Sequence, residues 1–348
     1  MPAQPPRSEP RADADVPALV SLYCGAGGLD IGFSRAGFDH LVALDSSPAA
    51  VRSWNHNLGS EVGRTADLDV DADLEGIVAL TRGRQVGILG GPPCQGFSRA
   101  RSNGVADDPR LRAPVRFAEI CTRVAQEADV AFVVLENVDA LLADRHADVV
   151  EEVTGHLTGI GLSVGTLVLQ ALDHGVAQRR SRAFLVATPV TGAEPQRSGA
   201  DTATVRDVIE ALPCPEFNTP DRVPVVGSHH ANHVTSRPKS DRFRTGTFNR
   251  WRSFRRLDWD QPSPTVAYGN REIHVHPDGD RRLSVYEAML LQGFDHEHRL
   301  FGTFSEQVQQ VSNAVPPPLG EAVARAVADA LTRARVGGAA PGIRDGKG

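Results

Sequence analysis

Residues 89–98 read Leu-Gly-Gly-Pro-Pro-Cys-Gln-Gly-Phe-Ser and directly follow a short apolar run that begins at Val86. Apolar runs that end at Gly and Pro are typical of a buried strand followed by a loop. The two glycines let the backbone approach a bound group closely, and the two prolines restrict the backbone just before Cys94. Open α/β sheets bind ligands at the carboxyl ends of their strands, so this stretch predicts a ligand site that presents a thiol. The alternative for Cys94 is a small buried hydrophobe, the usual role of a lone cysteine.

Length and composition indicate a soluble globular protein of two domains. The chain has 348 residues, of which 41% are hydrophobic and 23% are charged. No apolar run approaches the length of about 18 residues that suggests a membrane span. Residues 1–16 are rich in Pro, Arg and Asp and lack the apolar segment of a secretory signal, so we expect a disordered tail there. The net charge of −6 means that any surface for nucleic acid must be a local patch.

The four cysteines are scattered, at positions 24, 94, 121 and 214, and no two are spaced as Cys-x-x-Cys. This spacing argues against a zinc site and against a disulfide framework. We therefore expect no metal and a reducing, cytoplasmic location.

A strand, a turn and a helix follow one another near the N-terminus. Residues 19–23 are apolar, residues 24–28 read Cys-Gly-Ala-Gly-Gly, and a helical pattern comes next. Such a turn can bring backbone N–H groups close to a nucleotide-like ligand, although a tight turn without a ligand has the same pattern. The next strand, residues 41–44, ends in Asp45, which either hydrogen-bonds a ribose or is an ordinary strand-end carboxylate. The acidic run from Asp67 to Glu75 is typical of a solvated face.

Two further polar segments adjoin apolar runs. Glu136 directly follows the apolar residues 131–135. Burial at this strand end would raise the pKa of its carboxyl, so that it could donate a proton. The alternative is a carboxylate satisfied by local backbone. Residues 178–182 read Gln-Arg-Arg-Ser-Arg, and in an extended segment Gln178, Arg180 and Arg182 share one face while Arg179 lies on the other. The alternative for this segment is a solvated basic turn.

A basic segment lies in the turn-rich, irregular stretch 189–258. Within residues 229–256, eight basic residues accompany a single acidic residue, Asp241, and aromatic residues are interleaved with them. This composition is typical of a nucleic-acid surface, and the alternative is a solvated loop. The polar segment 99–114 predicts a mobile lid that carries arginines near a phosphate backbone.

Taken in order, these motifs resemble those of the DNA cytosine-5 methyltransferases from residue 19 to about residue 334. The resemblance is carried by the nucleophile motif at residues 90–98, by Glu136-Asn137-Val138, by Gln178-x-Arg180-x-Arg182, by residues 282–294 and by the Asn-Ala-Val-Pro-Pro motif at 313–317. The residues that differ from those common in the family are Ser21, Tyr23, Ser46, Ala177 and Ser312.

The resemblance implies S-adenosylmethionine as the cofactor, double-stranded DNA as the substrate, and a covalent bond between Cys94 and C6 of a flipped-out cytosine. It implies catalytic roles for Pro93, Cys94, Glu136, Asn137, Gln178, Arg180 and Arg182. It implies cofactor contacts at Tyr23, Cys24, Gly25, Ala26, Gly27, Gly28, Asp45, Ser46, Asp67, Leu68, Pro92, Asn313 and Ala314. We expect DNA contacts at Ser98, Arg99, Arg101, Arg242, Arg244, Arg250 and Arg252.

The expected fold is α/β, with a doubly wound, mostly parallel sheet of the Rossmann-like class I S-adenosylmethionine-dependent methyltransferases and a small inserted target-recognition domain. The expected parts are a disordered tail at 1–17, a catalytic domain at 18–190, a target-recognition domain at 191–281, a hinge and C-terminal helix at 282–335 that complete the catalytic domain, and a flexible tail at 336–348.

The resemblance also implies the modification enzyme of a bacterial restriction-modification system, monomeric and associated with the nucleoid, with a cognate restriction endonuclease as its partner. Two alternatives stay open, namely an RNA (tRNA) cytosine-5 methyltransferase of the same family and a non-catalytic DNA-binding homologue. A Rossmann dehydrogenase would share the Gly-rich turn and the acidic strand end, but it does not account for Pro93-Cys94 or Glu136-Asn137.

Overall fold

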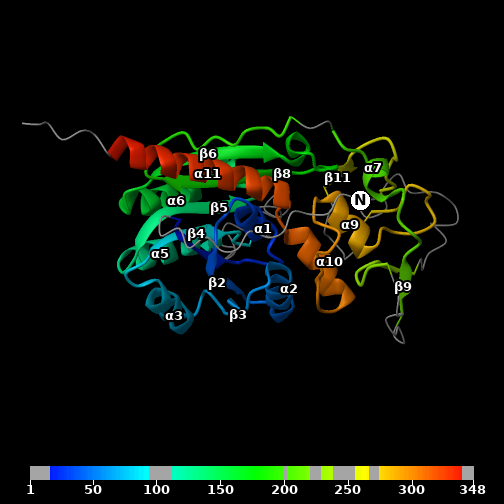
Figure 1. The fold of residues 1–348 in the computed structure, drawn as a ribbon, viewed down its shortest axis with the longest axis horizontal. Coiled ribbons are helices and arrows are strands. Elements are labelled where there is room, and N and C mark those ends of the chain that lie inside the picture. The colour runs from blue at the N-terminus through cyan, green and yellow to red at the C-terminus, as the bar shows by residue number, and fades with distance from the viewer. Residues whose placement is uncertain are drawn as a thin grey trace, which may run out of the picture.

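The structure, a computed structural model, describes residues 16–93, 112–199, 202–219, 229–237, 255–265 and 274–338. A sheet domain, in which helices flank a seven-stranded sheet, lies beside a smaller lobe (Figure 1). In the part of the chain that the structure describes, no helix has the length and apolar character needed to cross a membrane.

The sheet has the strand order β3-β2-β1-β4-β5-β8-β6. Neighbouring strands are parallel from β3 to β5, and β8 is antiparallel to both of its neighbours. The strands are β1 (Ala18–Leu22), β2 (His40–Asp45), β3 (Gly63–Thr65), β4 (Gln85–Gly90), β5 (Asp129–Asn137), β6 (Ser163–Gln170) and β8 (Ser181–Thr188). The order reverses between β1 and β4, which is the switch point at which open α/β sheets bind ligands. The predicted doubly wound, mostly parallel α/β fold is confirmed.

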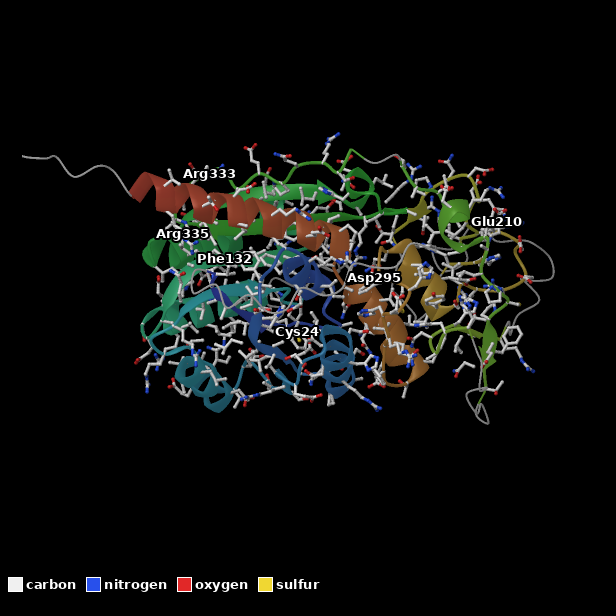
Figure 2. The ribbon with its side chains drawn as sticks, viewed as in Figure 1. Cys24, Phe132, Glu210, Asp295, Arg333 and Arg335 are labelled. Atoms are coloured by element: carbon white, nitrogen blue, oxygen red, sulfur yellow. The ribbon has the colours of Figure 1, made fainter. Side chains whose placement is uncertain are left out.

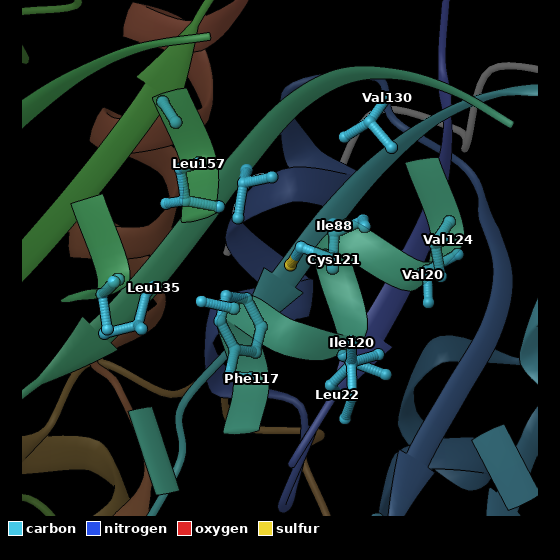
Figure 3. Packing of buried hydrophobic residues seen from close by; sticks show 14 of the residues in the cluster. Val20, Leu22, Ile88, Phe117, Ile120, Cys121, Val124, Val130, Leu135 and Leu157 are labelled. Carbon is cyan, nitrogen blue, oxygen red and sulfur yellow. The ribbon is translucent and has the colours of Figure 1, made fainter. Parts of the chain in front are cut away.

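Helices cover both faces of the sheet because alternate residues of each strand point to opposite faces. Val20 of β1 and Phe117 of α5 belong to one buried cluster, shown in Figure 3. Leu19 belongs to the cluster on the other face, together with Phe33 of α1 and Val323 of α11. The helices of this domain are α1 (Gly28–Arg35), α2 (Pro48–Leu58), α3 (Asp71–Thr81), α5 (Ala113–Ala125), α6 (Ala147–Gly159) and α11 (Pro317–Gly338). Among the described residues, the short 3-10 helices η2 (Asp139–Leu142) and η3 (Asp144–His146) connect β5 to α6, and η4 (Ala171–His174) follows β6.

The C-terminal helix α11 packs directly on the backbone of α1. A Cβ at Gly32 would lie 2.3 Å from the backbone nitrogen of Glu321, so only glycine fits there without a shift. A Cβ at Gly28 would lie 2.2 Å from the carbonyl oxygen of Val315. The segment before α11 therefore lies against the end of the Gly-rich turn.

A third buried cluster fills the smaller lobe, with Val205, Leu257 and Met289 among its members, and it extends to Ala26 and Ala177 beside the sheet domain. Its elements are α7 (Val205–Ile209), β9 (Glu216–Asn218), β10 (Val234–Ser236), β11 (Ser263–Pro264), α9 (Val285–Leu291) and α10 (Phe304–Asn313). β11 pairs in parallel with β7 (Gln178–Arg179). The lobe is thereby joined to the Gln-x-Arg-x-Arg motif by strand pairing.

Several predicted elements need correction. Helix α3 was not predicted, although Leu74, Ile77 and Val78 recur at helical spacing and are buried. Asp67, Asp69 and Glu75 of the acidic run are exposed, as a solvated face requires. The stretch 189–258, predicted as irregular, contains α7, β9 and β10.

The predicted lid and the predicted C-terminal tail also have different limits. Helix α5 begins at Ala113, inside the segment 99–114 that was expected to be a lid, and residues 99–111 lie outside the described residues. Helix α11 continues to Gly338, past the predicted start of the tail at 336.

Candidate active site

The carboxylate of Asp45 holds the Gly-rich turn after β1. The backbone turns through left-handed conformations at Tyr23 (φ 54°), Gly25 (φ 55°) and Gly27 (φ 83°). For a tyrosine this conformation is uncommon, and such residues cluster at ligand sites. The two oxygens of Asp45 accept the N–H of Gly25 at 2.9 Å and that of Ser47 at 2.8 Å. Burial raises the pKa of Asp45, and the two N–H donors oppose that shift.

A cavity of about 360 Å³ lies beside this turn. The end of β1, the residue Pro93 beyond β4 and the start of α5 contribute to its lining, which consists of Tyr23, Asp69, Pro93, Arg112, Ala113, Arg116 and Glu119. Arg116 holds the neighbouring loop, because its Nε donates to the carbonyl of Leu68 at 3.0 Å. In the same loop, Asp67 accepts the N–H of Asp69 at 3.1 Å. Sequence analysis missed Arg116 because nothing in its helix distinguishes it from a surface arginine.

Glu136 lies at the carboxyl end of β5 and is 6% exposed. Its Oε1 is 2.8 Å from Nε of Arg182, and a Cβ built at Gly91 would lie 3.2 Å from its Oε2. Burial raises the pKa of Glu136, while the positive charges of Arg182 and Arg180 oppose the shift. The site therefore holds a desolvated carboxyl next to a guanidinium and next to the loop that leads to Cys94.

Asn137 connects the end of β5 to that same loop. Its Nδ2 donates to the carbonyl of Pro92 at 3.1 Å, and its Oδ1 accepts the N–H of Val138. Pro92 is buried, whereas Pro93 is exposed and lines the cavity.

The Gln-x-Arg-x-Arg motif alternates as predicted, with Gln178 and Arg180 buried and Arg179 exposed. Nη2 of Arg180 donates to two backbone carbonyls, those of Ser312 at 2.7 Å and Ala314 at 2.8 Å. The amide of Gln178 is fully buried and has no hydrogen-bond partner within the described ranges. Arg182, further along the same motif, forms the ion pair with Glu136.

The Asn-Ala-Val-Pro-Pro motif lies next to the Gly-rich turn, through the contact of Val315 with Gly28. Ala314 is buried, while Asn313 is exposed and accepts a hydrogen bond from Gln309 at 2.8 Å. Segments almost 290 residues apart in the chain (28 and 315) therefore meet at the switch point.

Cys24, in the turn itself, is a buried free thiol, and Figure 2 shows it inside the sheet domain. Burial raises the pKa of Cys24 and also that of the buried Cys121. Neither thiol is therefore poised to ionise. Across residues 16–93 and the other described ranges, no group of three or more His, Cys, Asp or Glu could hold a metal ion.

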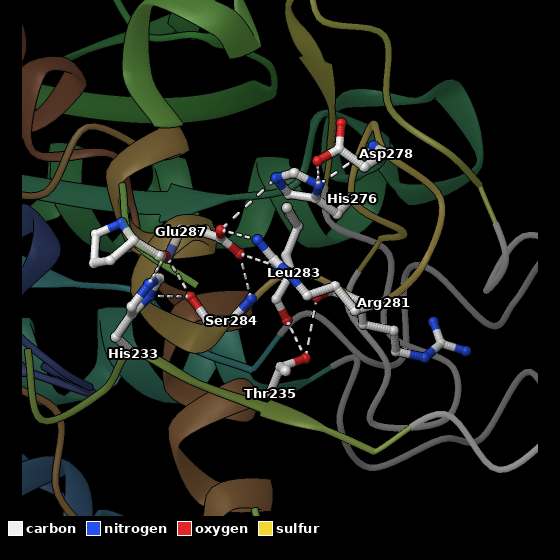
Figure 4. A network of polar contacts seen from close by, with 10 residues as sticks. His233, Thr235, His276, Asp278, Arg281, Leu283, Ser284 and Glu287 are labelled. Carbon is white, nitrogen blue, oxygen red and sulfur yellow. Dashed lines mark hydrogen bonds and ion pairs between the residues drawn. The ribbon is translucent and has the colours of Figure 1, made fainter. Parts of the chain in front are cut away.

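The smaller lobe is anchored at the first turn of α9 (Figure 4). The carboxylate of Glu287 accepts the N–H of Ser284 at 2.6 Å and two bonds from the guanidinium of Arg281, at 2.8 and 2.9 Å. His233 lies 2.9 Å from the hydroxyl of Ser284 and 2.7 Å from the carbonyl of Pro213. These buried contacts hold His233 and Arg281 against the start of α9 within the smaller lobe.

The thiol expected to act as nucleophile and the expected DNA contacts lie outside the described residues. They are Cys94, Ser98, Arg99, Arg101, Arg242, Arg244, Arg250 and Arg252. The structure does bring together, around the carboxyl ends of β1, β2, β4 and β5, the turn 23–28, Asp45, Pro92, Glu136 and Asn137.

The chain matches the family model described as C-5 cytosine-specific DNA methylase over residues 18–329. It is 32% identical over 328 residues to the Type II methyltransferase M1.HphI of Haemophilus parahaemolyticus, covering 88% of this chain and 86% of the relative. It is 29% identical over 335 residues to the Type II methyltransferase M.MthTI of Methanothermobacter thermautotrophicus, covering 89% of this chain and 96% of the relative.

Solved structures share the fold at lower identity. A DNA modification methyltransferase encoded within a prophage (E. coli) has a TM-score of 0.72 and 20% identity, covering 91% of this chain and 99% of that chain. The S. pombe Dnmt2 methyltransferase has a TM-score of 0.64 and 16% identity, covering 91% of this chain and 99% of that chain. At these identities the likeness shows the fold alone.

Proposed function

The chain belongs to the C-5 cytosine-specific DNA methylase family and is a DNA cytosine-5-methyltransferase, and from this premise we propose that it transfers the methyl group of S-adenosylmethionine to a flipped-out cytosine through a covalent adduct with Cys94. The observation that carries the proposal is the buried pair of Glu136 and Arg182, 2.8 Å apart, beside the loop that Asn137 holds. Cys94 is two residues beyond Pro92 in the sequence, and the proposal requires its thiol to reach the base that Glu136 contacts.

We infer that the switch point holds S-adenosylmethionine, on which this family depends in general. A half-buried strand-end carboxylate, a left-handed turn before a helix and an adjoining cavity fit a nucleoside with a charged tail. Asp45 would bind the ribose, Asp67 and Leu68 the adenine, and the turn from Tyr23 to Gly28 the tail. Ser46, Pro92, Asn313 and Ala314 complete the proposed contacts. When bound there, the cofactor supplies an electrophilic methyl group.

The proposed roles of the protein groups follow from the weak nucleophilicity of cytosine C5. The thiolate of Cys94 adds to C6, so that electron density moves to C5. Glu136, whose pKa burial raises, retains a proton for N3 and relieves the negative charge that develops on the ring. Arg182 donates to the base oxygen O2. After C5 has taken the methyl group, it loses its proton to a base, the C5–C6 double bond forms again and the thiolate of Cys94 leaves.

We propose that residues 191–281 form the target-recognition domain and that residues 18–190 and 282–335 form the catalytic domain. The division rests on the order of the sequence motifs, because the buried cluster that joins Val205 and Leu257 to Met289 crosses the boundary at residue 282. A base cannot be attacked from above its plane while it is stacked in a duplex, so the target must be flipped out. Pairing of β11 with β7 would then keep the recognition domain in register with the Gln178–Arg182 motif.

The relatives named above are called Type II methyltransferases, so we propose that this chain is the modification enzyme of a restriction-modification system of that type. A cognate restriction endonuclease, a monomeric state and a cytoplasmic, nucleoid-associated location follow as predictions.

Incubation with tritiated S-adenosylmethionine tests the proposed function. The acceptors are genomic duplex DNA free of 5-methylcytosine and, in a parallel reaction, unmodified tRNA. We expect tritium at C5 of cytosine in DNA and none in tRNA. Transfer to tRNA alone would support the RNA-directed alternative, and DNA binding without any transfer would support a non-catalytic homologue.

A further inference from the structure

Arg180 and Gln292 both direct their side-chain donors at the same backbone carbonyl, that of Ala314. Nη2 of Arg180 is 2.8 Å from this oxygen, and Nε2 of Gln292 is 2.7 Å from it. Arg180 also donates to the carbonyl of Ser312 at 2.7 Å, and Gln292 to that of Val311 at 2.8 Å. Arg180 is 1% exposed and Gln292 is 0% exposed, so these bonds are shielded from water.

These bonds satisfy backbone groups that the helix cannot satisfy itself. Helix α10 ends at Asn313, and the last carbonyls of any helix lack intrahelical partners. The chain continues into Pro316, Pro317 and Pro318, which have no N–H to donate. The guanidinium of Arg180 also places a positive charge at the carboxyl end of α10, where the helix dipole favours it. Without the two side chains, buried carbonyls at this helix end would lose their donors.

We propose that Arg180 and Gln292 are positioning residues of the cofactor pocket, which act by holding residues 312–315 against the Gly-rich turn, and this inference rests on the proposed function. Residues 312–315 contact the Gly-rich turn through Val315, whose carbonyl oxygen fills the space that a side chain at Gly28 would need. A shift of residues 312–315 would therefore move the backbone that packs against Gly28.

The two neighbouring arginines of the motif thus have different tasks. Arg182 pairs with Glu136, which is proposed to act on the base, whereas Arg180 donates to the backbone carbonyls of Ser312 and Ala314. Gln292 approaches the same point from the end of α9, the helix whose first turn anchors the smaller lobe. The segment that ends α10 is consequently hydrogen-bonded both to Arg180 of the Gln-x-Arg-x-Arg motif and to Gln292 of the smaller lobe.

The test compares Gln292→Met, Gln292→Glu, Arg180→Lys and the double variant Arg180→Lys/Gln292→Met with the wild-type protein. Calorimetry measures the Kd of S-adenosylhomocysteine, and methylation of genomic duplex DNA gives KM for S-adenosylmethionine and kcat. Gln126→Met, an exposed glutamine after α5, is the matched control. Thermal unfolding of each variant checks that it is folded.

We expect Gln292→Met and Arg180→Lys each to raise the Kd by about tenfold, because each leaves buried carbonyls short of a donor. KM should rise in parallel, while kcat changes less. Gln292→Glu should weaken binding at least as much, since it sets an acceptor against two carbonyls. The Kd of the double variant should exceed that of either single variant by less than about threefold, because both side chains hold the same segment. The control should match the wild type.

The proposal is overturned if the folded variants bind S-adenosylhomocysteine within about twofold of the wild type, or if the two single effects multiply in the double variant. If Arg180→Lys does not fold, the two Gln292 variants decide the matter by their Kd values alone. Failure of the wild-type protein to bind S-adenosylhomocysteine would overturn the proposed function itself, and the inference with it.

Discussion

The side-chain amide of Asn137 donates to the carbonyl of Pro92 at 3.1 Å, which ties the last residue of β5 to the loop beyond β4. The loop leaves the sheet at Gly91, next to Glu136, and continues to Cys94. One hydrogen bond between neighbouring strand ends thereby holds the backbone at Pro92, two residues before the predicted nucleophile in the sequence.

Replacing Asn137 by Leu should lower kcat by about tenfold or more, because the buried carbonyl loses its donor and the loop loses its fixed position. The Kd of S-adenosylhomocysteine should change much less. Gln85→Leu, at the amino end of β4 where the side chain contacts the exposed Asp129, serves as the control. An unchanged kcat in Asn137→Leu would show that the loop is positioned by other contacts.

Replacing Glu136 by Gln should slow single-turnover methyl transfer by about 10²-fold, since the variant cannot supply a proton to the ring. In the wild-type enzyme the rate should fall as the pH rises through the pKa of Glu136, which burial raises above its ordinary value. The variant should lack this phase of the pH profile. Glu127→Gln, an exposed carboxylate paired with Arg82, should retain both the rate and the profile.

A duplex that contains 5-fluorocytosine at the target position should trap the enzyme as a covalent adduct on Cys94, because fluorine at C5 cannot leave as a proton does. Cys94→Ser should form no adduct, transfer no methyl group and still bind S-adenosylhomocysteine. Peptide mapping by mass spectrometry checks the attachment site. Substantial turnover by Cys94→Ser would rule out the covalent mechanism.

Replacement by alanine at two helical glycines should change the free energy of unfolding in opposite directions. Gly32→Ala should lower the free energy of unfolding by about 1–3 kcal/mol, because its Cβ would lie 2.3 Å from the nitrogen of Glu321 in α11. Gly155→Ala, in α6 with nothing within 4 Å of the added Cβ, should raise it by about 0.5–1 kcal/mol. Urea unfolding measures both. Equal effects at the two positions would contradict the backbone contact between α1 and α11.

Stability should decline as the pH falls below about 6.5, the ordinary pKa of histidine. Burial lowers the pKa of His230 to about 4 and that of His298 to about 3. Between these values and the ordinary one, the unfolded chain binds protons that the folded protein does not, so the stabilisation is complete only above the ordinary pKa. Unfolding midpoints measured across this range check the slope. His298→Leu should flatten it, and an unchanged slope in this variant would contradict the prediction.

The sequence by itself determined where the main strands lie along the chain and where the loops at their carboxyl ends begin. Apolar runs such as 131–135, and turns such as Cys24–Gly28, are local signals, because strand periodicity and Gly or Pro punctuation involve only neighbouring residues. The placement of Gln178 and Arg180 on one face and Arg179 on the other was likewise predicted from a period of two, whereas the burial of that face was not predicted. The roles of these residues in the reaction stay predictions.

Only the tertiary structure decided which partner each polar side chain has. Arg180 and Arg182 look equivalent in the sequence, yet one donates to carbonyls 132 and 134 residues away and the other pairs with Glu136. Helix α3 does have a local signal, the helical spacing of Leu74, Ile77 and Val78, and was overlooked. The contacts of Gln292 and Arg116 could not be predicted from the sequence. A contact between distant segments leaves no periodic pattern in either of them, and a guanidinium bonds whichever acceptor the folded backbone brings within reach.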